Sequence, residues 1–379
     1  MEKRRESIIK KHLSKRLLFI IPGVVAYILN KYAQNHLDWA EQYSRVVYPV
    51  LSNAVGFLPS LVKISVSEWL VVLVLLFLLL YIVYYVRKVI ISKGTRRMEV
   101  YRGLVGIIAM GSVIYFCFTV VSGVNYHRDS FLSYSEYHEE KYSVEELAEL
   151  CQSLADDLGL VRAQLGADPD LLVQASDDFD YYAQHSVLSL QMLSEQYPVL
   201  ERSLYSTPKP VVLSKLMSRA GIQGIFFPFT LESNINVDMP VFTIPAAMTH
   251  ELAHQCGFMQ EDEAGFISYL ACTQQDDPMI LYSGLFLAFD HSISALEQVD
   301  PAKALAIKSG LSQTVQLDMV QNEQYWSQYE GVISNVSTRL NDAYLKANNQ
   351  TDGVYSYNKM VNLLLAEQRY KRSRTSVGL

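Results

Sequence analysis

The chain has 379 residues, half of them hydrophobic, and a formal net charge of −7 at pH 7. This length is enough for about two domains. The negative charge and the lack of a nucleic-acid recognition motif argue against nucleic acid as a partner. The four cysteines form no Cys-x-x-Cys pair, which argues against a disulfide framework and a thiolate zinc cluster.

Apolar residues concentrate before residue 125, in three runs. The second and third runs contain no charged residue, and each is long enough to cross a hydrocarbon core of about 30 Å. The first run is shorter and is interrupted by Pro22 and Gly23. Its basic flank is also the layout of a secretory signal peptide, but no small-x-small cleavage site follows, which favours an uncleaved span. We predict a membrane domain of residues 1–124 with transmembrane helices at about 17–29, 69–86 and 104–121.

The loop charges predict an orientation. Lysine and arginine are abundant in the N-terminal segment and in the connection Arg87–Arg102, whereas the connection between the first two runs is balanced by acidic residues. The positive-inside rule therefore places the N-terminus in the cytoplasm of a multi-pass protein of the cytoplasmic membrane. Three spans then deliver a domain of residues 125–379 to the extracytoplasmic side. If the first run did not cross the bilayer, this domain would lie inside.

The domain begins with helical patterns. Ser143 and Glu146 have the spacing of a capping box and predict a helix that ends at the Ala-Asp-Pro-Asp segment 167–170. A second helix is predicted over about 180–195, and a short one in VVLSKLMSRA, which ends at Gly221. We then predict two short strands in IQGIFFPFT and NINVDMPVF, separated by ESN. Prolines confine at least one of these strands to a sheet edge.

The remaining chain is predicted to be mainly helical. A helix begins at Thr243-Ile-Pro245 and ends at Gly257, and another begins at Glu261. An apolar helical run follows at Met279–Leu287, then an amphipathic stretch over 311–345 and a last helix around 360–367. These patterns predict a helix-dominated α+β domain with a small sheet.

The helix before Gly257 carries the sequence His250-Glu251-Leu-Ala-His254. Histidines at i and i+4 project from one helix face, within reach of one ion. The glutamate between them is about 100° round the helix, where it can take a proton from a metal-bound water without binding the metal. We expect His250 and His254 to bind Zn²⁺ and Glu251 to act as a general base.

A catalytic zinc site needs a third protein ligand and one open position. The next helix offers Glu261 and Glu263. Glu263 shares a face with the apolar residues Ile267 and Leu270, where a buried carboxylate is costly unless it binds metal or is paired. Glu261 lies beside Gly265 and is expected to be solvated. We therefore predict Glu263 as the third ligand.

This segment resembles the gluzincin branch of zinc metallopeptidases, in which a glutamate on a second helix completes the ligand set. It is still more similar to a family of uncharacterised bacterial three-span membrane proteins, through the blocks GIFFPFTLESNINVDMP, the histidine motif, LYSG and GVYSYNKMVNLLL. The resemblance implies a zincin-like fold for the domain and the same ligand and base assignments, but no substrate. One departure is Ile267, because many gluzincins have an aspartate at that position that orients a ligand histidine.

The sequence therefore predicts a membrane-anchored zinc metallopeptidase that hydrolyses a peptide, protein or cell-wall peptide substrate. Candidates for stabilising the oxyanion are Tyr282, His291, Tyr355 and Tyr357, without a reason to prefer one. The segment FFPFTLESNINV is a candidate edge for binding an extended peptide, or a plain structural hairpin. The alternative function is a non-catalytic sensor or assembly protein of the cell envelope that keeps the fold.

Overall fold

The computed structural model describes residues 15–138, 140–166, 179–350, 352 and 359–377. The chain divides into two compact units. Unit 1 contains the described residues up to Leu51, together with Val66–Arg128 and Pro228–Thr230. Unit 2 contains Ser52–Ser65 and the described residues of Asp129–Phe227 and Leu231–Leu379. The predicted domain of residues 125–379 therefore lacks one part of unit 2, the segment Ser52–Ser65.

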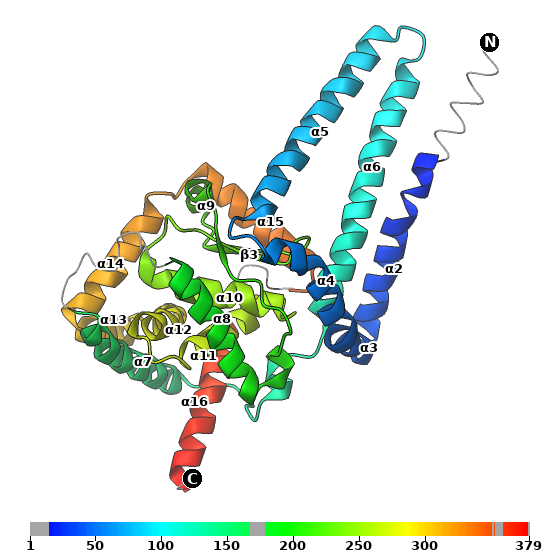
Figure 1. Cartoon of the computed structure of the whole chain (residues 1–379). Coiled ribbons are helices and arrows are strands. Elements are labelled where there is room, and N and C mark those ends of the chain that lie inside the picture. Colours follow the sequence, from blue (N-terminus) through cyan, green and yellow to red (C-terminus); the bar gives the residue numbers. More distant parts are fainter. Residues whose placement is uncertain (1–14, 139, 167–178, 351, 353–358, 378–379) are drawn as a thin grey trace. The chain divides into compact units, whose positions relative to one another are not determined.

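Unit 1 consists of long apolar helices, among them the antiparallel pair α5 and α6 (Figure 1). At 26 residues each, α5 and α6 are about 39 Å long. Most apolar side chains of α5 are exposed, as in a helix that faces lipid. The elements that begin in unit 1 are α2 (Ile21–Asn35), α3 (Leu37–Gln42), the π-helix η1 (Tyr43–Val47), α4 (Tyr48–Ser60), α5 (Val66–Ile91), α6 (Arg96–Val121) and the 3₁₀ helix η2 (Gly123–His127).

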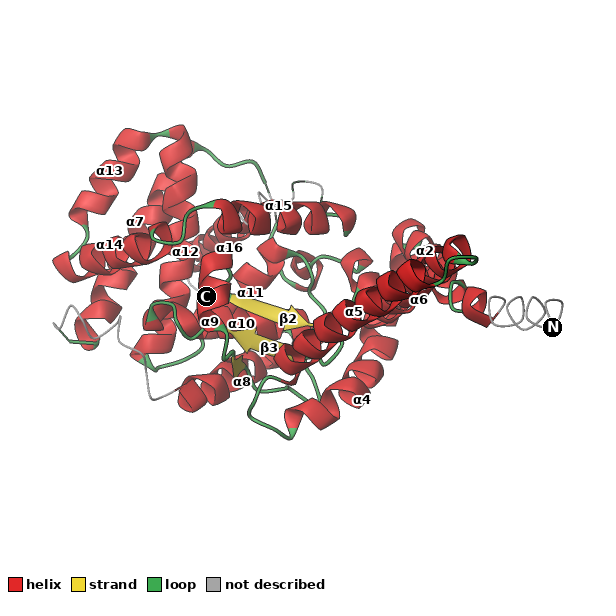
Figure 2. Ribbon diagram, turned by 90° about the horizontal axis from the view of Figure 1, so that it is seen from above, coloured by secondary structure: helices red, strands yellow, loops and turns green. Residues whose placement is uncertain are grey.

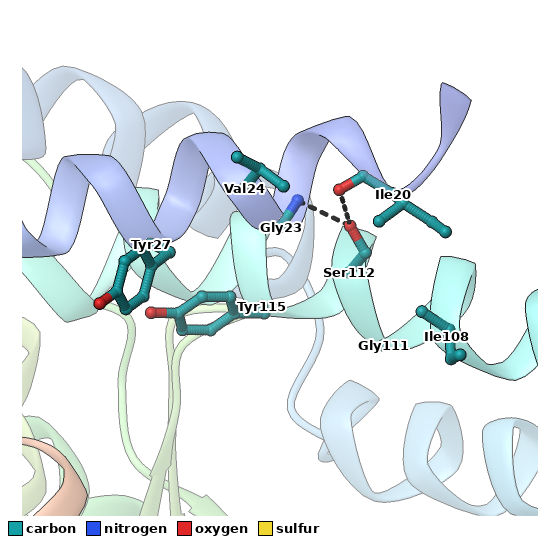
Figure 3. A pocket seen from close by; sticks show the side chains of 8 residues that line it. All are labelled: Ile20, Gly23, Val24, Tyr27, Ile108, Gly111, Ser112 and Tyr115. Atoms are coloured by element: carbon teal, nitrogen blue, oxygen red, sulfur yellow. Dashed lines mark hydrogen bonds between the residues drawn. The ribbon is translucent and has the colours of Figure 1, made fainter. Parts of the chain in front are cut away.

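The first apolar run has a turn at Phe19–Ile20, just before Pro22 and Gly23, and α6 satisfies part of the backbone there. The hydroxyl of Ser112 accepts a hydrogen bond from the Gly23 N–H at 2.6 Å and donates one to the Ile20 carbonyl at 2.9 Å (Figure 3). A Cβ at position 23 would lie 2.6 Å from the Ser112 oxygen, so only glycine allows this approach. In a bilayer such internal pairing is needed, since no water satisfies the broken helix.

Four described helices are long and apolar enough to cross a membrane. Three of them, Lys15–Asn35, Val66–Ile91 and Arg96–Val121, cover the three predicted runs. The fourth is α12 (Pro278–Val299), and 67% of its most apolar window is buried inside the structure. It packs against α7, α10 and α11. Its apolar character is therefore explained by its place in the core of unit 2.

Unit 2 is mainly helical, with a small sheet (Figure 2). The predicted capping box is present, because Ser143 and Glu146 each pair with the other's backbone N–H. The predicted break at 167–170 lies outside the described residues. The helices are α7 (Val144–Gln164), α8 (Phe179–Gln196), α9 (Ser214–Ala220), α10 (Ile244–Gln255), α11 (Glu261–Cys272), α12, α13 (Pro301–Gly310), α14 (Gln313–Ser327), α15 (Val332–Ala347) and α16 (Met360–Val377), with short 3₁₀ helices η3 (Phe131–Tyr134), η4 (Pro198–Leu200) and η5 (Val241–Thr243).

The sheet has three strands in the order β1-β3-β2. Strand β2 (Gly224–Phe227) pairs with β3 (Glu232–Ile235) in antiparallel fashion, and β1 (Lys209–Pro210) pairs with β3 in parallel. The first predicted strand agrees with β2. The second predicted strand begins two residues too late, because Glu232 and Ser233 are part of β3, and it continues past the end of β3 at Ile235. Strand β1 was not predicted.

The two faces of β3 contact different partners. Ser233 faces α10, where its hydroxyl accepts a hydrogen bond from Gln255 at 2.9 Å. Asn234 faces the other side and accepts one from the hydroxyl of Ser65 at 2.7 Å. Glu232, also on that side, forms a buried ion pair with Lys209, whose ammonium group donates to the Pro59 carbonyl at 2.6 Å. The sheet therefore lies between α10 and the segment Ser52–Ser65.

Candidate metal centre

Helix α10 holds both histidines of the motif. Pro245 lies in its first turn, where its missing N–H costs no hydrogen bond. The rings of His250 and His254 are perpendicular, with centroids 4.8 Å apart. The helix ends as predicted, because Gly257 adopts a positive φ of 88° and its N–H bonds to the His254 carbonyl. The next N–H, from Phe258, bonds to the Ala253 carbonyl and completes a Schellman motif.

A carboxylate from α11 meets the two imidazoles, and it belongs to Glu261. Its Oε2 lies 3.1 Å from Nε2 of His250 and 3.6 Å from Nε2 of His254. One ligand atom from each of the three residues lies within 4.8 Å of the others. Zinc bonds of 2.0–2.2 Å in a tetrahedron require ligand atoms about 3.4 Å apart. The two distances from the Glu261 Oε2 are close to this value, and all three ligand atoms are near enough to converge on one ion.

The structure places the predicted third ligand, Glu263, away from the two histidines and brings Glu261 beside them in its place. The Glu263 carboxylate is buried and accepts a hydrogen bond from the Phe131 N–H at 2.7 Å. The prediction assumed that α11 has one apolar and one solvated face. In fact α11 is enclosed, with every residue from Glu263 to Cys272 buried, so the apolar stripe does not identify the side facing α10.

Two contacts orient the cluster, and neither was predicted. Nδ1 of His254 lies 2.7 Å from the Phe258 carbonyl. This carbonyl fixes Nδ1 as the protonated nitrogen and leaves Nε2 for a metal. The buried Gln350 donates to the Met259 carbonyl at 3.0 Å and accepts from the Glu261 N–H at 3.4 Å, which fixes the start of α11. The contact with the Phe258 carbonyl follows from the chain reversal at Gly257. The contacts of Gln350 could not be predicted from any local sequence pattern.

The metal-free cluster is strongly coupled electrostatically. Burial alone would lower the pKa of His254, but the Glu261 carboxylate outweighs burial and raises this pKa to about 9. Burial likewise opposes ionisation of Glu261, but the two imidazoles hold its pKa well below the ordinary value. Without metal, the site therefore keeps an imidazolium beside a carboxylate. Metal binding would displace the imidazolium proton.

Glu251 lies beside this cluster, between α10 and β2. Burial raises the pKa of Glu251, against the lowering effect of the two histidines and of a hydrogen bond from the Phe226 N–H. Gly224 leaves room for this carboxylate, because a Cβ there would lie 2.6 Å from the Glu251 Oε1. The ring of Phe226 also approaches His254, with centroids 6.2 Å apart. The requirement for glycine at position 224 was not visible in the sequence.

The candidates for stabilising an oxyanion have different surroundings. Tyr282 is fully buried and donates its hydroxyl hydrogen to Asp318 at 2.7 Å, in a cluster with the buried Arg162. This bond gives Tyr282 a structural role. His291 is neutral at pH 7, because burial, helped by nearby His250, lowers its pKa to about 4. Tyr355 and Tyr357 lie outside the described residues.

Searches among curated proteins and among solved structures found no match. Residues 43–365 match one family model, described as "Protein of unknown function (DUF3810)". The matched region includes the sheet, α10, α11 and all four residues of the site. With most of its length covered by that model, the chain belongs to the DUF3810 family.

Proposed function

We propose that the chain is a membrane-anchored, zinc-dependent metallopeptidase. The observation that carries the proposal is the spacing of His250, His254 and Glu261, with the buried Glu251 beside them. Two imidazoles and one carboxylate are a donor set that suits zinc. Three protein ligands leave one tetrahedral position open, as a catalytic site requires and a structural site does not.

The residues around the cluster fit the hydrolysis of an amide. Zinc in such a site activates water and polarises a carbonyl group. Glu251 accepts the proton of the attacking water and returns it to the leaving amine. The raised pKa of Glu251 makes its carboxylate a stronger base near neutral pH. The Phe226 N–H holds the carboxylate in place before reaction.

Strand β2 offers a surface for a peptide substrate. It is an edge strand, since the sheet order of the described residues is β1-β3-β2. An extended peptide can bind such an edge through main-chain hydrogen bonds. Gly224 and Phe226 of β2 lie against Glu251, so a peptide on this strand would run past the base.

The same proposal places unit 2 outside the cytoplasm. Ser52–Ser65, between the first two spans, is part of unit 2, so unit 2 lies on the side reached after the first span. The pair α5 and α6 returns the chain to that same side. The basic N-terminus lies across the first span, on the cytoplasmic side by the positive-inside rule. A reporter that is active only in the cytoplasm should be silent after Leu379 and active near Lys93, and the opposite pattern would reverse the orientation.

Zinc content and peptide hydrolysis of the full-length protein in nanodiscs test the activity. A mixed library of peptides and cell-wall fragments serves as substrate. Glu251→Gln should keep zinc and lose at least about 100-fold in rate, because the amide cannot accept the proton. Glu330→Gln, an exposed change of the same kind, is the matched control. Equal rates for wild type and Glu251→Gln would exclude this mechanism.

The alternative function gives a different result in the same experiment. A non-catalytic sensor or assembly protein would bind the metal without turnover of any library member. Its metal spectrum, measured after replacement of zinc by cobalt, would show no exchangeable water. Turnover that depends on Glu251 would exclude this alternative.

A further inference from the structure

We propose that helices α9 and α15 form a surface that docks unit 2 on the lipid bilayer. We call it the α9–α15 surface and define it by the exposed side chains of Leu216, Val332, Ile333, Val336 and Leu340. The proposal also assigns a substrate class, a peptide segment that lies at the membrane surface. This second part rests on the proposed peptidase function, whereas docking does not.

Helix α15 exposes its apolar face, which is the opposite of what is usual for a helix of a water-soluble domain. Val332, Val336 and Leu340 follow one another at i+4, with exposed fractions of 79%, 48% and 66%. Ser334, Ser337 and Asn341 lie on the other side of the helix and are half-buried. An amphipathic helix in water normally buries its apolar stripe. A helix with its apolar face outward is typical of one lying in a membrane interface.

The neighbouring helix extends the same surface. α15 packs against α9, where Leu213 and Leu216 are 44% and 53% exposed. Exposed cationic side chains accompany the apolar ones. They are Lys215 and Arg219 on α9 and Arg339 beside the stripe of α15, whereas the nearby Lys346 is paired with Asp342 at 2.8 Å. Apolar residues with flanking lysine and arginine suit the headgroups of anionic lipids.

This surface is attached close to the point where the chain enters the membrane. Ser65 directly precedes α5 and bonds to Asn234 of β3. α9 is bonded to the residues that follow β3, since its Ser214 hydroxyl accepts from the Val237 N–H at 2.9 Å. Asn234 and Val237 are three residues apart, which in extended chain is about 10 Å. Within unit 2, Figure 1 shows α9 and α15 on one side and α16 on the other.

The candidate metal site lies across the sheet from the bond between Ser65 and Asn234. α10 packs on the opposite face of the sheet through the bond between Gln255 and Ser233. Layers that pack face to face are about 10 Å apart. The cluster of His250, His254 and Glu261 therefore lies on the order of 10–20 Å from Ser65, the last residue of unit 2 before α5. A peptide that reaches β2 there is presented by the membrane, as an exposed segment of a membrane protein or a lipid-linked peptide.

Spin-label accessibility tests docking without any need for activity. The full chain carries Cys117→Ser, which removes the exposed cysteine, and is labelled at Leu340→Cys in nanodiscs with anionic lipid. The matched control is Asn335→Cys, an exposed position on the polar flank of α15. The label at 340 should collide more with oxygen than with a water-soluble nickel complex, and the label at 335 should show the reverse. Equal nickel access at both positions overturns docking. Dipolar coupling between two labels at 340 also overturns it, because a second copy would then cover the surface.

Hydrolysis of anchored and free peptide tests the substrate class. A peptide cleaved in the library is offered with and without a palmitoyl chain on nanodiscs. Wild type should cleave the anchored form at least tenfold faster. Val336→Asp with Leu340→Asp should lose this preference and keep its rate on the free peptide, whereas Asn335→Asp with Thr338→Asp should behave as wild type. A preference that persists in the first variant overturns the assignment. Absence of any cleavage by wild type, with the accessibility result intact, refutes the peptidase proposal alone.

Discussion

Replacing Glu261 or Glu263 by glutamine should have opposite consequences for metal affinity and for stability. The Glu261 carboxylate lies 3.1 Å and 3.6 Å from the two imidazole nitrogens. The Glu263 carboxylate instead accepts the Phe131 N–H at 2.7 Å. Glu261→Gln should therefore lose metal, and Glu263→Gln should keep metal and lose only stability.

The expected sizes follow from these contacts. Loss of a residue that only supports a ligand reduces metal affinity about 10–100-fold, so loss of the ligand Glu261 should exceed 100-fold, or about 2.7 kcal/mol. In Glu263→Gln the amide oxygen still accepts from Phe131, but the bond loses its charge. The difference between charged and neutral acceptors is about 1 kcal/mol. For a unit of this size, that lowers Tm by about 2–4 °C.

Both quantities are measurable on the full-length protein in nanodiscs. Competition with a zinc chelator gives the affinity, and thermal unfolding of the metal-free protein gives Tm. Because the two variants make the same chemical change two residues apart, each is the control for the other. Zinc loss in Glu263→Gln together with normal affinity in Glu261→Gln would refute the geometry of the site.

Three further predictions concern the same layers of unit 2. Since His254 has a pKa of about 9 without metal, zinc binding at pH 7 should release close to one proton from His254, and this contribution, absent in His254→Ala, should fall to none well above pH 9, as calorimetry in buffers of different ionisation enthalpy would reveal. Gly224→Ala should push the Glu251 carboxylate from its place, lowering the hydrolysis rate while zinc content stays normal; an unchanged rate would contradict the close contact. Lys209→Met removes the buried cation that pairs with Glu232 and should cost about 3–5 kcal/mol in unfolding experiments, whereas Lys209→Met with Glu232→Leu should be far less destabilising.

Local sequence patterns were sufficient to predict much of α10, the helix that holds both histidines. Helix geometry alone predicts that His250 and His254 lie on one face of α10 and that the helix ends at Gly257. The structure has both features. The carboxylate that lies beside the histidines could not be predicted in this way, because choosing between Glu261 and Glu263 requires knowledge of what surrounds α11. A stripe of apolar residues indicates an inward face only when the other face meets water, and α11 has no such face.

The sheet was less predictable for a different reason. β1 has two residues, one of them proline, and contains no periodicity. It is held by β3 and by Pro59, which is 150 residues away from Lys209. The sequence pattern does not predict the start of β3 at Glu232, because Glu232, Ser233 and Asn234 are polar. They tolerate burial because each has a partner, in Lys209, Gln255 and Ser65 respectively.

The bond between Ser65 and Asn234 has a consequence for biosynthesis. The two residues are 169 positions apart, and both candidate spans α5 and α6 are made between them. At 5–20 residues per second, Asn234 follows Ser65 after roughly 10–30 s of translation. On the proposed topology, Ser52–Ser65 is on the far side of the membrane without its sheet during that interval, and its exposed Phe57, Leu58 and Leu61 are available to chaperones. On the same topology, unit 2 would be completed only after the α5–α6 pair has been inserted.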